Sequence, residues 1–171
     1  MQQFIRSVAL FVCMFTVVIP SADAQAKKPK IGERIGAWAF QCQAVAADKT
    51  LCALVQAAVN KKTGKQVMRA VVRPVGEGKN LKVGLFVTVP LGIFLAPGVA
   101  GKVDKGKQFS FILQSCRQAG CEAAIELDKK LQKAMRGGKV LVVGFKPTAT
   151  SEPVGVSISL EGFTAGLKAL K

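Results

Sequence analysis

Residues 108–127 read QFSFILQSCRQAGCEAAIEL, two runs of alternating apolar and polar residues joined by a short segment between two cysteines. Alternation with a period of two predicts a strand that buries one face and exposes the other. The apolar positions are Phe109, Phe111 and Leu113 in the first run, and Cys121, Ala123, Ile125 and Leu127 in the second. We therefore expect two antiparallel strands with a turn between them.

The same alternation recurs in residues 38–42, 66–72, 81–89 and 154–160, and glycine-containing turn signals separate the runs. Short alternating strands with frequent turns predict an all-β fold, mainly an antiparallel β-sandwich with one or two short helices. The residues expected in its core are Val83, Leu85, Val87, Phe109, Phe111, Ile125, Val156 and Ile158.

Two segments interrupt the strand pattern with helical spacing. Asp128 is a good N-cap, Leu131 and Met135 are four residues apart, and Gly137 is a good helix stop. A second short helix is expected near the end of the chain, where Phe163 and Leu167 are also four residues apart.

The first 24 residues have the pattern of a cleavable signal peptide. Arg6 precedes an uncharged apolar run over residues 8–19, and Ala22-Asp23-Ala24 supplies a cleavage site before Gln25. The run is shorter than the about 20 residues of a membrane-spanning helix. We therefore expect no transmembrane span in the mature chain and a periplasmic location, with secretion or association with the outer membrane as further options. Residues 25–33 are expected to be a flexible basic arm, and residues 34–171 a single domain.

The composition bounds the function. Lys and Arg number 25 against 10 acidic residues, a net charge of +15 that favours anionic partners. The chain has neither His nor Tyr, which removes Ser-His-Asp and Cys-His nucleophilic sites and His-bearing metal sites. It has no phosphate-binding, dinucleotide or calcium motif. We therefore predict no enzyme, no cofactor and no metal. Nucleic acid is not favoured, because the basic residues are not interleaved with aromatic ones.

The expected mature chain has four cysteines, which allow three disulfide connectivities. An exported protein meets an oxidising environment, so disulfides are expected. Each of two local pairs, Cys42 with Cys52 and Cys116 with Cys121, brackets a turn-like segment, which favours local pairing. A four-cysteine zinc site is the alternative, although the spacing contains no C-x₂-C pair.

One predicted strand face is strongly basic. Arg69 and Arg73 lie opposite the apolar positions of residues 66–72, with no acidic residue between Asp48 and Glu77. The candidate anion-binding or partner-binding face consists of Lys61, Lys62, Lys65, Arg69 and Arg73. An anionic envelope polymer or host-surface polymer would contact mainly the two arginines. An ordinary solvated face, paired with Glu122 or Glu126 on a neighbouring strand, is the open alternative.

Residues 83–99 form the most apolar stretch of the expected mature chain, and Pro90, Gly92, Pro97 and Gly98 break it. A strand, a turn and a second short strand are more natural here than a spanning helix. We favour burial of residues 91–95 in the core over an exposed apolar loop that touches lipid or a partner.

Four landmarks occur in order along the chain: Gly36-Ala37-Trp38 ahead of the first cysteine pair, residues 89–98 (VPLGIFLAPG), Cys116-Arg-Gln-Ala-Gly-Cys121, and residues 158–163 (ISLEGF). In these the chain resembles the invasion-associated locus B family of exported bacterial proteins, over about residues 33–170. It departs at Ala37, where that family usually carries an acidic residue. The resemblance implies a β-sandwich in the periplasm or at the cell surface. The family is named for the entry of certain bacteria into host cells, and the resemblance carries over no catalytic residue.

Three functions remain open from the sequence. The first is a non-catalytic envelope or cell-surface protein that aids host-cell or envelope interaction through its basic surface, or binds a protein partner. The second is a carrier of an apolar ligand between its sheets, which requires a large pocket lined by Phe109, Phe111 and Leu85. The least favoured is a hydrolase or transferase that uses lysines and carboxylates, for which Glu122 and Glu126 on one strand are a conceivable pair.

Overall fold

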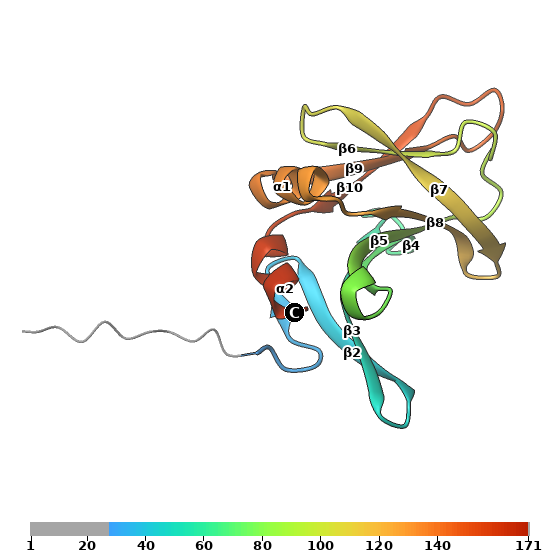
Figure 1. Cartoon of the computed structure of the whole chain (residues 1–171). Helices are drawn as coiled ribbons and strands as arrows, with labels where there is room; N and C mark the ends of the chain where they lie inside the picture. Colours follow the sequence, from blue (N-terminus) through green and yellow to red (C-terminus); the bar gives the residue numbers. More distant parts are fainter. Residues whose placement is uncertain (1–27, 171) are drawn as a thin grey trace, which may run out of the picture.

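A computed structural model describes residues 28–170 and shows an antiparallel β structure with two short helices (Figure 1). The all-β class expected from the alternation is confirmed. The expected signal peptide, residues 1–24, lies outside the described residues, as do residues 25–27 of the expected arm. The elements are β1 (Arg34–Ile35), β2 (Trp38–Ala46), β3 (Lys49–Val59), β4 (Gln66–Val75), a 3-10 turn (Gly78–Asn80), β5 (Lys82–Val89), β6 (Val99–Val103), β7 (Gln108–Arg117), β8 (Gly120–Glu126), α1 (Lys129–Gly137), β9 (Val140–Phe145), β10 (Val154–Ser159) and α2 (Phe163–Ala169).

The ten strands form one continuous sheet in the order β1-β2-β3-β4-β5-β8-β7-β6-β9-β10. Strand β7 pairs with β6 through residues 108–111 and with β8 through residues 112–117, so the sheet changes partner along this strand. The sheet folds over there and brings β10 into contact with β3 and β4 (Figure 1). The two layers of the sandwich are therefore parts of one sheet. In the described residues, no helix is long and apolar enough to span a membrane.

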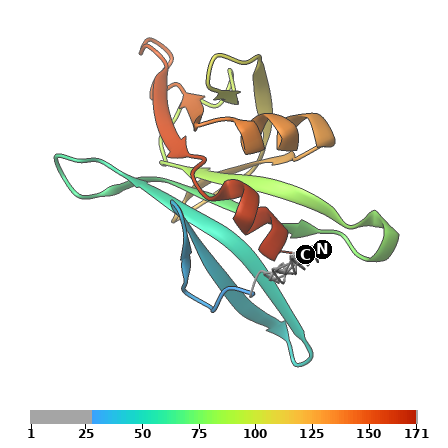
Figure 2. The ribbon, with the colours of Figure 1, turned by 90° about the vertical axis from the view of Figure 1, so that its left-hand side faces the viewer.

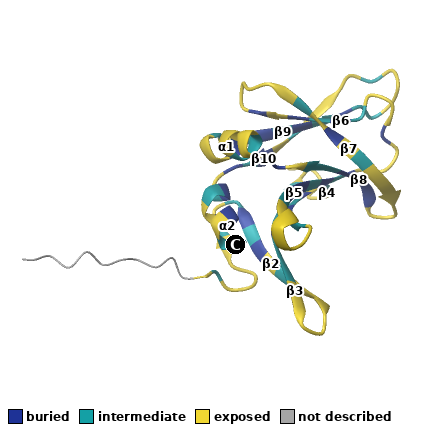
Figure 3. Cartoon of the chain, in the orientation of Figure 1, coloured by how far each residue is buried: buried dark blue, intermediate teal, exposed yellow. Residues whose placement is uncertain are grey.

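The inner faces of the two layers make the core, as the period-two pattern predicts (Figure 3). Of the residues expected inside, Leu85, Val87, Phe111 and Ile158 are buried, whereas Val83, Phe109, Ile125 and Val156 are half-buried and pack against the core. Val83, Phe109 and Ile125 each lie one residue from a strand end, and Val156 lies on the edge strand β10, so fewer neighbours cover these side chains.

Both helices form where the spacing predicts them. The Asp128 side chain accepts a hydrogen bond from the backbone N–H of Leu131 at 2.6 Å and so caps α1, while Met135 is buried. Helix α2 buries Phe163 and Leu167 and packs so closely that a Cβ at Gly166 would lie 2.7 Å from the Leu54 side chain. The two helices contact one another and cover the same side of the sandwich (Figure 1).

Two landmarks far apart in the sequence meet at this side. The backbone N–H of Ala37 donates to the carbonyl oxygen of Glu161 at 3.1 Å, and the rings of Trp38 and Phe163 lie 5.9 Å apart. Gly36 and Gly162 both have positive φ, and a Cβ at either residue would collide with the backbone of the opposite segment. The glycines are needed because two backbones cross in contact there.

One polar contact ties the layers together. The side-chain amide of Gln56 on β3 donates to the carbonyl oxygen of Ser159 on β10 at 3.0 Å and accepts from its backbone N–H at 2.9 Å. Strand β10 is an edge strand, so Gln56 satisfies backbone groups that lack a neighbouring strand.

The segment expected to be a flexible basic arm is partly fixed to the sheet. The backbone N–H of Gly32 donates to the carbonyl oxygen of Phe40 at 2.7 Å, and the N–H of Phe40 donates to the carbonyl oxygen of Glu33 at 2.8 Å. Residues 32 and 33 thus hydrogen-bond to β2, and the flexibility expected of residues 25–33 stays a prediction. The backbone groups of residues 32 and 33 extend the ladder that β1 forms with β2.

The loops and turns that connect the strands lie at two opposite ends of the sandwich. Arg69 on β4 pairs with Thr88 on β5, and Val89 pairs with Cys121 on β8, so the loops next to these residues leave the sheet at one end. Phe94 forms an isolated bridge with Lys146, which places the β9–β10 loop at the same end. The segments of this loop end are residues 60–65, 90–98, 117–120 and 146–153.

Candidate functional site

The candidate anion-binding residues occupy one side of β4 and the turn before it. Strand β4 buries Met68, Ala70 and Val72, so Arg69 and Arg73 lie on the outer face of the large layer. Lys61 and Lys62 lie in the β3–β4 turn, where the Asn60 side chain accepts from the backbone N–H of Lys62 at 2.9 Å. Lys65 is the residue just before β4. The β3–β4 hairpin projects from the body (teal, at the left of Figure 2).

Between the two arginines runs an apolar row that no single segment of sequence contains. Val71 pairs with Val55 on β3 and with Phe86 on β5. The pairing continues outward, so that the row crosses six strands through Ala39, Val55, Val71, Phe86, Ala124 and Ile112. The outer face therefore offers apolar side chains with a guanidinium group on each side of Val71.

An open groove of about 750 Å³ lies over the β2–β3–β4 part of this face. Its walls include Val55, Val71, Arg69 and Arg73, together with residues of β2 such as Gln41. The guanidinium carbon of Arg73 lies 4.2 Å from the centre of the Phe86 ring. Such stacking orients an arginine while leaving its in-plane N–H groups free to donate to a carboxylate or sulfate.

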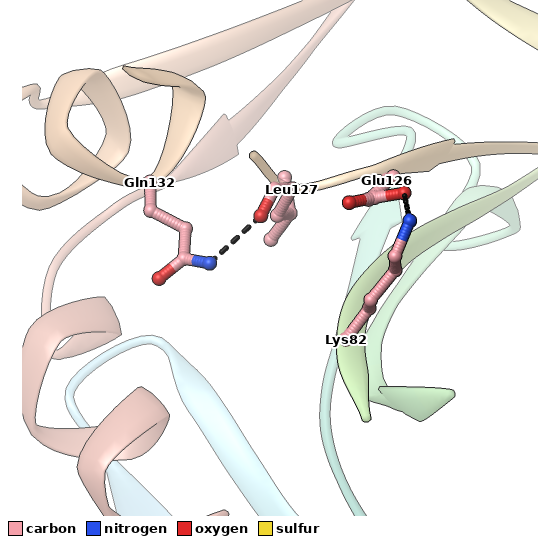
Figure 4. Close-up of polar contacts among 4 residues, drawn as sticks. All are labelled: Lys82, Glu126, Leu127 and Gln132. Atoms are coloured by element: carbon pink, nitrogen blue, oxygen red, sulfur yellow. Dashed lines mark hydrogen bonds and ion pairs between the residues drawn. The ribbon is translucent and has the colours of Figure 1, made fainter. Parts of the chain in front are cut away.

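The acids that could neutralise this face are engaged elsewhere or lie at a distance. Glu126 on β8 accepts from the Lys82 ammonium at 2.7 Å (Figure 4). Glu122 lies opposite Thr88, which pairs with Arg69 on its other side, so two strand spacings of about 4.8 Å each separate Glu122 from Arg69. Within residues 28–170 the side-chain ion pairs are Lys49–Glu77 and Lys82–Glu126, and neither involves an arginine of this face.

Glu77 belongs to the opposite end of the sheet from the loop end. Its carboxylate accepts a hydrogen bond from the Lys49 ammonium, and this bond, with the nearby positive charge, lowers the pKa of Glu77 below its usual value. The pair joins the first residue of β3 to the β4–β5 connection, so it does not offset the charge of Arg69 and Arg73.

Both cysteine pairs are disulfides in the structure. Cys42 is bonded to Cys52 and Cys116 to Cys121, and each bond joins directly opposed residues of one hairpin. This is the local pairing expected from the turn-like segments, and it leaves none of the four thiolates for the alternative zinc site. Each bond therefore fixes one hairpin: β2–β3 in the first case, β7–β8 in the second.

The carrier of an apolar ligand requires a pocket between the sheets, and the structure has an open surface groove near the expected residues instead. Leu85 and Phe111 are packed in the core. An open groove of about 500 Å³ lies where α1 meets β7 and β8, and its walls include Phe109, Ile125 and Leu131. The side chain of Gln132 on α1 donates to the Leu127 carbonyl oxygen at 2.7 Å and fixes the helix beside this groove (Figure 4).

The hydrolase alternative has little support in the geometry. Glu122 and Glu126 share the outer face of β8 and are both exposed. Four residues of strand separate them, which is about 13 Å along β8, and Glu126 forms the ion pair with Lys82. Paired carboxylates of glycosidases lie about 5–9.5 Å apart, so these two do not form such a pair.

The expectation that residues 91–95 lie in the core is wrong for most of the segment. Ile93 is 9% exposed, but Leu91, Phe94 and Leu95 are 54%, 38% and 47% exposed. The segment leaves β5 at the loop end, and only Ile93 turns back toward the core. The sequence carried a signal for a loop here, since residues 90–98 contain two prolines and two glycines.

Residues 38–171 match the family described as "Invasion associated locus B (IalB) protein". The chain is 32% identical over 130 residues to two invasion protein B homologs of Brucella abortus, from strain 2308 and from biovar 1 strain 9-941. Each alignment covers 76% of this chain and 73% of the relative. The crystal structure of invasion associated protein B from Bartonella henselae superposes with a TM-score of 0.71 at 27% identity, covering 82% of this chain and 95% of the other.

Proposed function

The chain belongs to the invasion associated locus B family, and from this membership we propose that it is a non-catalytic exported protein of the bacterial envelope or cell surface. Its task in this proposal is to bind an acidic polysaccharide of the envelope or of a host-cell surface. Two disulfides in a chain of this size support an oxidising compartment such as the periplasm. The relatives carry names of invasion proteins, which is consistent with a binding role.

The observation that carries the proposal is the outer face of β4 and its neighbours. Arg69 and Arg73 lie about 13 Å apart along the strand, on either side of the apolar row through Val71. An acidic polysaccharide presents the same two features, because its carboxylate or sulfate groups are anionic and its sugar rings have apolar C–H faces. Guanidinium groups pair with these anions through two parallel hydrogen bonds, and Phe86 and Val55 offer surface for the rings.

Retention on immobilised heparin at rising salt tests this function. We expect the protein to be retained at low salt and released as the Debye length falls from about 10 Å at 0.1 M to about 3 Å at 1 M. The double variant Arg69→Ser/Arg73→Ser should elute at clearly lower salt. A matched control is Lys102→Ser/Lys133→Ser, which removes the same charge from exposed positions on β6 and α1.

The two double variants distinguish binding through the β4 face from retention by the overall positive charge. If both elute together, retention follows net charge alone and the β4 face is not the site. If Arg69→Ser/Arg73→Ser elutes with the unmodified protein, polymer binding through this face is ruled out. Unchanged thermal midpoints for both variants ensure that the comparison reports binding, since Arg73 also contacts the Phe86 ring.

A further inference from the structure

Residues 90–98 form a surface loop without a single polar side chain. The segment PLGIFLAPG connects β5 to β6, and Leu91, Phe94 and Leu95 are all exposed. Surface loops are ordinarily rich in polar residues, and a cluster of exposed large apolar side chains marks a contact with lipid or a partner. None of these residues lines the grooves described above.

The loop is held in place, so its apolar side chains are presented outward. Ile93 turns into the core, and the backbone N–H of Phe94 donates to the carbonyl oxygen of Lys146 at 2.8 Å. A second turn closes where the N–H of Gly98 donates to the carbonyl oxygen of Leu95 at 2.8 Å. Leu91 lies just before the first anchor, and Phe94 and Leu95 lie within the anchored part, yet all three residues remain exposed.

Further exposed apolar residues gather at the same end of the sandwich. Val59 ends β3 before the β3–β4 turn, and Val154 begins β10 after the β9–β10 loop. Of the exposed large apolar residues in the described chain, three belong to the loop end, Leu91, Phe94 and Leu95, and two border it, Val59 and Val154. The β5–β6 loop, the β7–β8 turn and the β9–β10 loop lie together on the side away from α1 and α2 (right of Figure 1). The apolar side chains thus concentrate at the loop end.

The same end is positively charged. Its four segments, residues 60–65, 90–98, 117–120 and 146–153, carry five basic residues and one acid, namely Lys61, Lys62, Lys65, Arg117 and Lys146 against Glu152. Arg117 pairs with Gly120, and a Cβ on that glycine would lie 2.9 Å from the Thr88 side chain near the end of β5, so Arg117 is one strand away from the strand end that leads into the apolar loop. Exposed apolar side chains and cations at one end of a molecule are the combination that binds an anionic membrane surface.

We propose that the loop end docks peripherally on an anionic lipid bilayer, with Leu91, Phe94 and Leu95 inserted among the headgroups and the cations in contact with lipid phosphates. Insertion to a depth of about 5–10 Å suits a short projecting loop, whereas a protein interface of standard size needs about 800 Å² from each partner. The proposal does not rest on polysaccharide binding, because the inserting side chains lie outside the outer face of β4.

Co-sedimentation with lipid vesicles tests the docking. The disulfide-bonded protein should sediment with vesicles of phosphatidylcholine mixed with phosphatidylglycerol, and much less with phosphatidylcholine alone. Leu91→Ser/Leu95→Ser should lower the partition coefficient by at least about tenfold, because two leucines lose their transfer from water. A matched control is Val45→Ser/Leu81→Ser, which changes two exposed apolar residues at the opposite end and should bind like the unmodified protein.

A fluorescence reporter locates the inserted residue directly. The chain contains one tryptophan, Trp38, which is fully buried and contributes a constant background. In a Phe94→Trp variant the emission should shift to shorter wavelength on adding anionic vesicles and be quenched by brominated lipid. An unshifted emission with bound protein would show that the protein binds by another face.

Several results of the vesicle assays would overturn the proposal. The proposal is wrong if the protein does not sediment with anionic vesicles, or if Leu91→Ser/Leu95→Ser binds them as well as the unmodified protein. It is also wrong if the control Val45→Ser/Leu81→Ser loses as much binding as Leu91→Ser/Leu95→Ser. A dimer in lipid-free solution that becomes monomeric in Leu91→Ser/Leu95→Ser would assign the loop to a second copy of the chain. Arg69→Ser/Arg73→Ser separates the two proposals, since it should lose retention on heparin but keep binding of vesicles through the apolar loop.

Discussion

Replacing Gly162 with alanine should destabilise the protein where the backbone around Gly36 crosses the backbone around Gly162. Gly162 has a φ of +79°, and a Cβ there would lie 2.5 Å from the carbonyl carbon of Ile35 and 2.8 Å from the backbone nitrogen of Gly36. Real Cβ contacts essentially never fall under 3.0 Å, and both obstacles are backbone. The crossing segments must therefore separate.

The size of the effect follows from two contributions. A left-handed φ costs an alanine about 1–2 kcal/mol, and separating the segments loosens the packing of Phe163 on Trp38. We expect a total loss of about 3–5 kcal/mol in the free energy of unfolding, within the range of disruptive core changes. For a domain of this size that lowers the thermal midpoint by roughly 10 °C.

Two other glycines separate the contributions in a thermal or urea unfolding assay. Gly32→Ala has a similar φ of +86° but open space around its Cβ, so it should show only the backbone cost. Gly137→Ala has open space and no positive φ, so it should be close to neutral. If Gly162→Ala and Gly32→Ala unfold with free energies equal within about 0.5 kcal/mol, the close backbone approach does not matter and the reasoning is refuted.

Two further predictions concern the core and processing. Phe111→Ala should lower the free energy of unfolding by about 3–5 kcal/mol, because Phe111 is 5% exposed. Ile112→Ala, at a residue that is 69% exposed, should change it by no more than about 0.5 kcal/mol. If urea unfolding shows the larger loss for Ile112→Ala, the inner and outer faces of β7 have been assigned the wrong way round. Non-reducing mass spectrometry of the exported protein should find Gln25 as the first residue and peptides linked as Cys42–Cys52 and Cys116–Cys121; an intact signal peptide or crossed linkage would contradict the expected processing.

The sequence alone determined which residues of each strand face inward. Alternation is a local property of an extended backbone, so Met68, Ala70 and Val72 are recognisable as one buried face without knowledge of their neighbours. The same holds for α1, where Asp128 and Met135 mark a cap and a buried face within one short segment. The local disulfides followed from the same kind of short-range pattern.

The candidate site was only partly visible at that level. The basic residues of β4 were recognisable by their period, since Arg69 and Arg73 are four residues apart on one strand. The apolar row between them was not, because Val55, Val71 and Phe86 come from three strands and meet only through the registers of β3 with β4 and β4 with β5. Register depends on the whole sheet, where a shift of one residue moves each side chain to the other face.

Tertiary structure alone decided which apolar residues stay exposed and which distant segments touch. The composition of residues 90–98 predicted burial, yet the fold leaves Leu91 and Leu95 in solvent, because the core is already filled by the inner faces of the two layers. Gly36 and Gly162 are likewise ordinary glycines in the sequence, and only the crossing of their backbones requires them. The transfer of an apolar side chain out of water is favourable in free energy wherever it occurs. The path of the chain determines whether the protein itself or another surface covers that side chain.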